Sequence, residues 1–126
     1  MSARVVHFEV PFDDADRARR FYREVFGWQI QEVPEMGYNL VSTGPATDQG
    51  MPAEPGYIGG GMLQRQEPAS TPIITLDVDD IDAALVAVKE HGGSPVSDKI
   101  PVGDMGFAAY FDDSEGNRMG LWQSAH

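Results

Sequence analysis

Two residues capable of acid–base chemistry, His7 and Glu9, lie two positions apart in an apolar stretch near the start of the chain. The alternation of residues 5–10 predicts a β-strand, in which side chains two apart point to the same face. An imidazole or a carboxylate held in a partly dry site can remove a proton from a bound ligand. If the chain is an enzyme, we therefore expect His7 or Glu9 to be its general base.

A second polar pair with the same spacing, Thr75 and Asp77, occurs in the apolar stretch 73–78. The intervening positions of both stretches are apolar and suit a core: Val6, Phe8 and Val10 in the first, and Ile74, Leu76 and Val78 in the second. Polar groups on the opposite face are typical of a concave surface that binds small ligands. An outer face exposed to solvent would show the same pattern, and the sequence is compatible with both.

Composition excludes several classes of function. The chain has no cysteine, which excludes disulfides, thiolate metal ligands and thiol nucleophiles. No serine has the flanking glycines of a nucleophile elbow, so a covalent hydrolase is not indicated. Nine Lys and Arg against 20 Asp and Glu give a formal charge of −11, which repels a phosphate backbone and argues against nucleic acid as a partner. Without a long apolar segment, a cytoplasmic protein that does not enter a membrane is expected.

An internal repeat predicts the elements that position these side chains. Each half shows a strand, a helix with an acidic cap, a glycine stop and three further strands. In the first half the helix follows Asp13 or Asp14 and ends at Gly27. Its apolar stripe consists of Ala15, Ala18, Phe21, Tyr22, Val25 and Phe26. The strands of this half are expected at residues 5–10, 28–33, 38–43 and 57–64.

The second half follows the same plan after a linker at residues 67–70. Its helix follows Asp79 or Asp80 and ends at Gly92, and its strands are expected at residues 73–78, 96–102, 107–111 and 118–123. Two halves with the same order of elements predict an α+β protein built from two tandem βαβββ modules. We expect one domain over residues 1–126, with module one at about 3–66 and module two at about 71–124.

Segments near both ends of the sequence resemble the vicinal oxygen chelate superfamily. The stretch from His7 to Pro11, followed by Arg17, Phe21-Tyr22 and Phe26-Gly27-Trp28, is similar to the opening of these proteins. Gly116-Asn117-Arg118, leading into Gly120-Leu121-Trp122-Gln123, is similar to their closing strand. The superfamily includes glyoxalases, bleomycin-resistance proteins and extradiol dioxygenases. The resemblance implies that the two modules form an incomplete barrel, the glyoxalase/bleomycin-resistance-like fold.

The resemblance also implies where a metal would bind, because metal-dependent members carry ligands on the first and last strand of each module. Those positions hold His7, Thr75, Gly120 and the run Gly59–Met62. Only His7 is a good ligand, whereas a catalytic zinc, iron or nickel site needs about three from the protein. We therefore expect no metal and no other cofactor. The alternative is an improvised divalent-metal site from His7, Glu9 and Asp77, although residues two apart on a strand lie roughly 6–7 Å from each other.

Together these observations predict a small-molecule-binding protein of the glyoxalase/bleomycin-resistance type. His7 and Glu9 are the catalytic candidates, and the ligand-binding candidates are Thr75, Asp77, Gly120 and Trp122. Trp122 and Gly120 are two positions apart in the predicted strand, so they should face the same side of the sheet. A large ring beside a residue without a side chain predicts an apolar pocket there.

Two other hypotheses remain open. The first is a metal-dependent lyase, isomerase or dioxygenase-type enzyme with an atypical site around His7, and the second is an oligomerisation or regulatory module without a ligand. The expected partners are a small-molecule ligand and a second copy of the chain in a homodimer. The modules could pair within one chain or swap between two chains, and the sequence is compatible with both.

Overall fold

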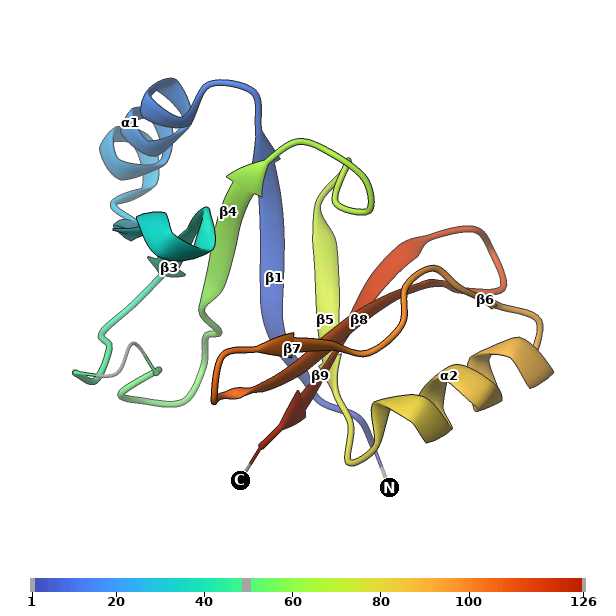
Figure 1. The fold of residues 1–126 in the computed structure, drawn as a ribbon. Helices are drawn as coiled ribbons and strands as arrows, with labels where there is room; N and C mark the ends of the chain where they lie inside the picture. The colour runs from blue at the N-terminus through green and yellow to red at the C-terminus, as the bar shows by residue number, and fades with distance from the viewer. Residues whose placement is uncertain (1, 49–50, 126) are drawn as a thin grey trace. The chain divides into compact units, whose positions relative to one another are not determined.

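The computed structural model describes residues 2–48 and 51–125, and its fold is α+β. The chain divides into two compact units. The first unit is His7–Pro72, and the second unit is Ile73–His126 together with Met1–Val6. The order of elements in the first unit follows the predicted βαβββ plan, and the second unit follows it with one additional short strand after its helix (Figure 1). That residues 1–126 form one domain stays a prediction.

The first unit contains a mixed sheet with the strand order β2-β3-β4-β1. Strand β1 (Val5–Phe12) pairs in parallel with β4 (Gly60–Gln64), while β2 (Gln29–Val33) and β3 (Tyr38–Ser42) add antiparallel neighbours. Helix α1 (Ala15–Phe26) connects β1 to β2. A short 3-10 helix, η1 (Pro34–Met36), fills the turn between β2 and β3 and was not predicted.

The second unit repeats this plan. Strand β5 (Ile73–Asp77) pairs in parallel with β9 (Arg118–Ser124), and β9 pairs antiparallel with β8 (Gly106–Asp112). Helix α2 (Ile81–Glu90) follows β5. Two short strands, β6 (Ser94–Pro95) and β7 (Ile100–Val102), both pair with β8.

The single strand predicted over residues 96–102 is therefore wrong, because the chain is interrupted between β6 and β7. The backbone N–H groups of Val96 and Ser97 both donate to the carbonyl oxygen of Tyr110, at 2.9 and 3.2 Å. Val96 and Ser97 thus lie opposite the single residue Tyr110, which is the geometry of a β-bulge. A β-bulge locally disrupts the pairing of two strands.

The predicted start of each helix is confirmed, and so is the predicted end of α1 at Gly27, whereas α2 ends at Glu90 with His91 as its C-cap, one residue before the predicted Gly92. The Asp14 side chain accepts from the backbone N–H of Arg17, and Gly27 takes the left-handed conformation (φ 69°) that ends α1. The Asp80 side chain accepts from Ala83 N–H at the start of α2. A contact that was not predicted adds to this cap, since the Gln123 side chain of β9 accepts from Ile81 N–H at 2.8 Å. With 12 and 10 residues, neither helix is long and apolar enough to cross a bilayer, and the described residues hold no other candidate.

Each helix covers an apolar cluster on one face of its own sheet. In the first unit the buried residues are Phe12, Ile30, Val41 and Met62, with Phe8, Val10, Ala15, Ala18, Tyr22 and Trp28 packed around them. In the second unit they are Ile81, Ala109, Phe111 and Leu121, with Leu76, Val78, Ala84, Leu85, Val88, Phe107 and Met119 around them. The predicted core faces are confirmed for Phe8 and Val10, and for Leu76 and Val78. Ile74 is 48% exposed, so its predicted place in the core is wrong, whereas its neighbour Ile73 is buried.

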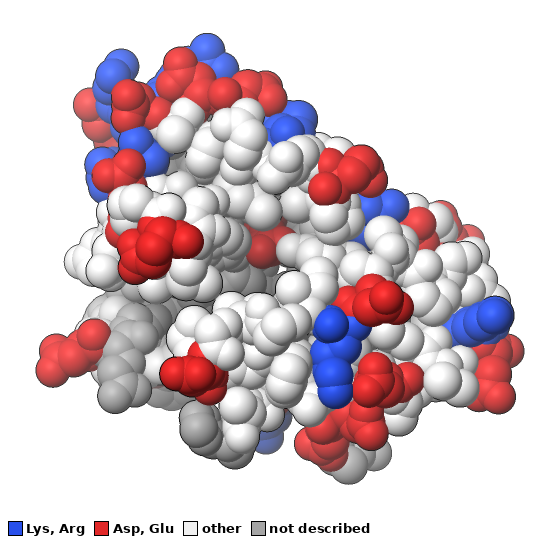
Figure 2. All heavy atoms as spheres, in the orientation of Figure 1, with Lys and Arg blue, Asp and Glu red and all other residues white. Residues whose placement is uncertain are grey.

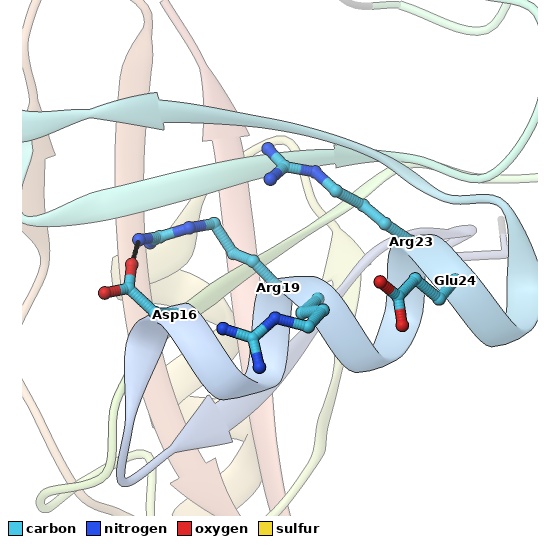
Figure 3. Close-up of a pocket in the computed structure, with 5 residues that line it drawn as sticks. Asp16, Arg19, Arg23 and Glu24 are labelled. Atoms are coloured by element: carbon cyan, nitrogen blue, oxygen red, sulfur yellow. Dashed lines mark hydrogen bonds and ion pairs between the residues drawn. The ribbon is translucent and has the colours of Figure 1, made fainter.

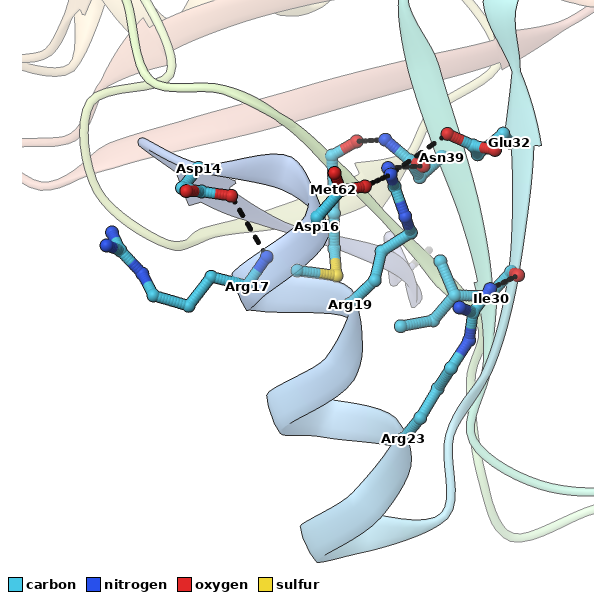
Figure 4. Close-up of polar contacts among 9 residues, drawn as sticks. All are labelled: Asp14, Asp16, Arg17, Arg19, Arg23, Ile30, Glu32, Asn39 and Met62. Carbon is cyan, nitrogen blue, oxygen red and sulfur yellow. Dashed lines mark hydrogen bonds and ion pairs between the residues drawn. The ribbon is translucent and has the colours of Figure 1, made fainter.

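The predicted apolar stripe of α1 is only partly buried. Ala15, Ala18 and Tyr22 reach the core, but Phe21, Val25 and Phe26 are more than half exposed. On the margin of α1 that carries Arg19 and Arg23, the arginine side chains hold the helix to the sheet (Figure 4). Arg19 donates to Asn39 and forms ion pairs with Asp16 and Glu32, and Arg23 donates to the Ile30 carbonyl oxygen. These contacts hold the arginine margin against β2 and β3 and leave the margin with Phe21 and Val25 facing solvent, whereas Phe26 is exposed as the last residue of the helix.

Candidate functional site

His7 and Glu9 are joined by a third residue, Tyr38, in one hydrogen-bonded network. The Tyr38 hydroxyl donates to Glu9 Oε2 at 2.9 Å and lies 2.8 Å from His7 Nε2. His7 and Glu9 lie on β1 and Tyr38 is the first residue of β3, all in the first unit. The phenol therefore spans the gap that strand geometry leaves between two side chains two positions apart.

Register and side-chain alternation explain why Tyr38 reaches this place. In β3 the side chains of Asn39 and Val41 are buried on the helix side, so Tyr38 points to the opposite face of the sheet. Strand β4 separates β3 from β1, and its Gly61 pairs directly with Glu9. A Cβ atom on Gly61 would overlap the Tyr38 ring, so the ring crosses β4 over this glycine.

Sequence reasoning missed Tyr38 as a site residue. The sequence places it only as the first residue of the strand predicted over residues 38–43. The available signal was the glycine run at 59–61, which indicates close approach of another group to that strand. The structure confirms the close approach. The Tyr38 ring lies over Gly61 on one face of the sheet. On the other face, the Phe8 ring lies so close to Gly60 that a Cβ atom there would be 2.6 Å from it.

Burial sets the electrostatics of this network. Glu9 is only 8% exposed, and a carboxylate removed from water needs hydrogen-bond donors such as the Tyr38 hydroxyl. Burial lowers the pKa of His7 below its ordinary value, and the nearby Glu9 charge offsets part of this effect. His7 is therefore a neutral imidazole at neutral pH, able to donate from one ring nitrogen and accept at the other.

The four remaining predicted site residues lie in the second unit, on neighbouring strands. Thr75 pairs with Gly120 and Asp77 pairs with Trp122 in the register of β5 and β9. A Cβ atom on Gly120 would meet the Thr75 hydroxyl oxygen at 2.8 Å, which shows that both residues face the same side. The indole of Trp122 lies over Gly106, where a Cβ atom would meet it at 2.8 Å.

Six residues predicted from the sequence thus form two groups, one in each unit. His7 and Glu9 are brought together by Tyr38 in the first unit. Thr75, Asp77, Gly120 and Trp122 are brought together by pairing of β5 and β9 in the second. Their roles in ligand binding stay predictions.

The donor set of the first group does not fit a catalytic metal centre. It offers one imidazole and one carboxylate, and both are hydrogen-bonded to the same phenol. Across residues 2–48 and 51–125, no group of three or more His, Cys, Asp or Glu side chains is arranged to hold a metal ion. A catalytic zinc site takes about three protein ligands and leaves one position open.

A surface depression lies beside α1, away from this network (Figure 3). It has a volume of about 400 Å³ and is lined by Asp16, Arg19, Arg20, Arg23 and Glu24. Charged side chains of both signs gather over this helix (Figure 2). However, Arg19 and Arg23 are engaged with the sheet, as described above, so these arginines hold the helix in place. The depression contains none of the predicted site residues.

Comparison with known proteins places the chain in a family. Residues 4–44 match the family model "Bleomycin resistance protein-like N-terminal". A glyoxylase-like domain-containing protein of Didymella fabae is 35% identical over 114 residues, which cover 86% of this chain and 84% of that protein. The chain belongs to the glyoxalase/bleomycin-resistance family of the vicinal oxygen chelate superfamily.

Other members of the family differ in length and in what their names describe. CFP32 of Mycobacterium tuberculosis, whose name groups it with the glyoxylases, is 30% identical over 116 residues; these cover 88% of this chain but only 42% of that protein. Among solved structures, a variant of Streptomyces coelicolor methylmalonyl-CoA epimerase in complex with 2-nitronate-propionyl-CoA superimposes with a TM-score of 0.65. It is 19% identical, with all of both chains covered, so this likeness shows the shared fold alone.

Proposed function

We propose that this glyoxalase-like chain binds a small organic ligand on the sheet face that carries His7, Glu9 and Tyr38. The observation that supports it most is the network itself, in which one hydroxyl serves a buried carboxylate and a desolvated imidazole. Burying such groups costs free energy, and groups of this kind concentrate at binding and active sites. The structural relative bound to 2-nitronate-propionyl-CoA supports a fold that accommodates small molecules.

Binding without a metal is part of this proposal. At the positions where metal-dependent relatives are expected to carry ligands, this chain has His7, Thr75 and Gly120. The Tyr38 hydroxyl occupies Nε2 of His7, the one good ligand among them. In the second unit, taken by itself, Thr75, Asp77, Gly120 and Trp122 are the proposed ligand-binding residues, with the Trp122 indole supplying apolar area.

Metal content measured by elemental mass spectrometry tests the metal-free proposal. Untagged protein is incubated with nickel, zinc, iron or manganese and then dialysed, in parallel with the variants His7→Ala and His91→Ala. His91 is an exposed histidine at the end of α2, and it serves as the matched control. We expect substoichiometric metal that neither substitution changes. One metal retained per chain, lost in His7→Ala but kept in His91→Ala, would overturn the proposal.

Ligand binding itself is tested by thermal shifts with a set of flat apolar compounds. A compound that binds only the folded state raises the melting temperature in proportion to its concentration and affinity. We expect shifts in the wild type that are reduced in Tyr38→Phe, which tests the residues proposed in the first unit, and in Trp122→Ala, which tests those proposed in the second. Equal shifts in the wild type and both variants would place binding elsewhere and contradict both sets of proposed residues.

A second candidate function is a lyase or isomerase reaction in which His7 accepts a proton from the substrate. The lowered pKa of His7 favours it, because a general base must be unprotonated at working pH. Turnover that is abolished in His7→Ala while ligand binding persists would favour this enzyme. The metal-dependent lyase, isomerase or dioxygenase-type alternative requires instead the metal retention described above.

Two further features are proposed for the protein in the cell. We expect a homodimer, because most soluble oligomers are twofold dimers, and a cytoplasmic location. Size-exclusion chromatography with light scattering tests the first, and a monomeric mass over the working concentration range would overturn it. Neither a nucleic acid nor a membrane is an expected partner, given the formal charge of −11.

A further inference from the structure

The shared hydroxyl of Tyr38 determines which nitrogen of His7 carries the proton. A phenol has one hydrogen to donate, and a carboxylate can only accept. The hydrogen of Tyr38 is therefore directed to Glu9 Oε2, 2.9 Å away. The short contact of 2.8 Å between the same oxygen and His7 Nε2 is then a hydrogen bond only if Nε2 is the donor.

A neutral imidazole protonated at Nε2 has its lone pair at Nδ1. Within residues 2–48 and 51–125, the structure shows no hydrogen-bond partner for His7 Nδ1, and no buried side-chain nitrogen or oxygen lacks a partner. The two observations together mean that Nδ1 is not completely buried, although the His7 side chain is partly buried. A partly accessible acceptor with a fixed direction is thus held beside a buried carboxylate.

We propose that Tyr38 is a positioning residue that fixes His7 in the Nε2–H tautomer, so that Nδ1 accepts a hydrogen bond from a neutral O–H or N–H group of the ligand. This inference rests on the proposed binding function and names the ligand class. A carboxylate or phenolate ligand is disfavoured, because it would meet the Nδ1 lone pair and the Glu9 charge. The matching chemistry is a neutral hydroxyl or amine, carried here by the flat apolar compounds proposed above as ligands.

The tautomer is measured first, because it needs no ligand. Long-range ¹H–¹⁵N correlation spectra separate protonated from unprotonated ring nitrogens, and His7→Gln identifies the His7 signals. We expect the Nε2–H form in the wild type and in the control Tyr57→Phe, which removes a hydroxyl bonded to Ala53 N–H. In Glu9→Leu the Tyr38 hydroxyl loses this acceptor and can donate to His7, so Nδ1–H should increase. Tyr38→Phe should give a mixture of tautomers.

The ligand class is measured with three matched probes: 2-naphthol, 2-methoxynaphthalene and 2-naphthoate. Calorimetric titration at neutral pH should show 2-naphthol binding about five- to tenfold more tightly than its methyl ether, the effect of one net hydrogen bond. The naphthoate should bind most weakly. In Tyr38→Phe the preference for the hydroxyl should shrink, and in Tyr57→Phe it should persist.

Each contrary result overturns a different statement. A wild-type His7 protonated at Nδ1 overturns the tautomer inference and leaves the proposed binding function standing. Equal affinity for 2-naphthol and 2-methoxynaphthalene overturns the role of Nδ1 as acceptor. If the Nε2–H tautomer is found but none of the three probes binds, the ligand class is overturned, and the general thermal-shift screen decides separately whether the proposed function fails as well.

Discussion

The ring of Tyr38 lies over Gly61, so closely that a Cβ atom at position 61 would overlap the phenol. Gly61 on β4 pairs with Glu9 on β1, and β4 lies between β1 and β3, the strand that carries Tyr38. Gly61 therefore lies between Tyr38's strand and the Glu9 carboxylate to which Tyr38 donates. Three residues far apart in sequence are thereby required together. Glu9 supplies the acceptor, Tyr38 the donor, and Gly61 the space for the donor to cross the sheet.

The first prediction concerns Gly61→Ala, which should move the Tyr38 ring and break its bonds to His7 and Glu9. We expect a loss of about 1–3 kcal/mol in unfolding free energy, typical of forced overpacking, measured by urea denaturation. Gly60→Ala is the matched control, because its Cβ atom meets the Phe8 ring on the opposite face. Both variants should be destabilised, but only Gly61→Ala should change the His7 tautomer signals. A Gly61→Ala protein with wild-type His7 signals would contradict the role given to this glycine.

Much of the first unit was predictable because the determining patterns are local. Alternation in residues 5–10 placed His7 and Glu9 on one face, and the caps at Asp14 and Gly27 were confirmed. Tyr38 could not be assigned to the site in the same way. Its approach depends on the register of three strands, β3, β4 and β1, and on a glycine that pairs with a strand some 50 residues earlier in the chain.

The errors have a similar origin. A stripe of apolar residues predicts that a helix has a buried face, but not how the helix is rotated on its sheet. In α1 the rotation is set by Arg19, whose partners Asn39 and Glu32 lie on other elements. The interruption near Val96 follows from hydrogen bonds to Tyr110 on β8, which no local pattern reveals.

The second prediction is the pH dependence that follows from His7. Burial lowers the pKa of His7 in the folded state, so the unfolded chain binds more protons between the folded and unfolded pKa values. His7 therefore contributes no pH dependence above its ordinary titration range. As the pH falls from that range towards the lowered pKa, stability should decrease by at most about 1.4 kcal/mol per pH unit.

Urea denaturation midpoints between neutral and mildly acidic pH measure this effect. His7→Gln should remove a part of the acid-side loss of stability, whereas His91→Gln at the exposed end of α2 should retain it. Identical pH profiles for wild type and His7→Gln would show that His7 is not desolvated in the folded protein.

The third prediction concerns Arg19, whose side chain is only 12% exposed. Arg19→Ala removes the donor to Asn39 Oδ1, and Asn39 is itself buried at 6% exposure. A buried acceptor left without its donor costs about 1–3 kcal/mol. Arg20 is exposed on the same helix, so Arg20→Ala should change stability by no more than about 0.5 kcal/mol. Similar denaturation midpoints for the two variants would mean that Arg19 does not hold the helix to the sheet.

The last prediction connects Thr75 and Gly120, the two residues that stand at expected ligand positions without offering a good ligand. A Cβ atom at position 120 would meet Thr75 Oγ1 at 2.8 Å but Thr75 Cβ only at 3.5 Å, an ordinary contact. Gly120→Ala alone should therefore destabilise the protein by about 1–2 kcal/mol. In a Thr75→Ala background the clash is absent, and alanine in a strand is intrinsically favoured over glycine by about 0.5–1 kcal/mol.

Gly120→Ala should thus be neutral or stabilising when Thr75 is alanine, with a coupling energy of at least about 1 kcal/mol in a double-mutant cycle. Gly106→Ala is the control, since its Cβ atom meets the Trp122 indole at 2.8 Å and its cost should be the same in both backgrounds. Additive effects of Thr75→Ala and Gly120→Ala would show that the hydroxyl does not occupy the space beside Gly120. Strong coupling would mean that the side chain at position 75 determines whether position 120 can hold a side chain.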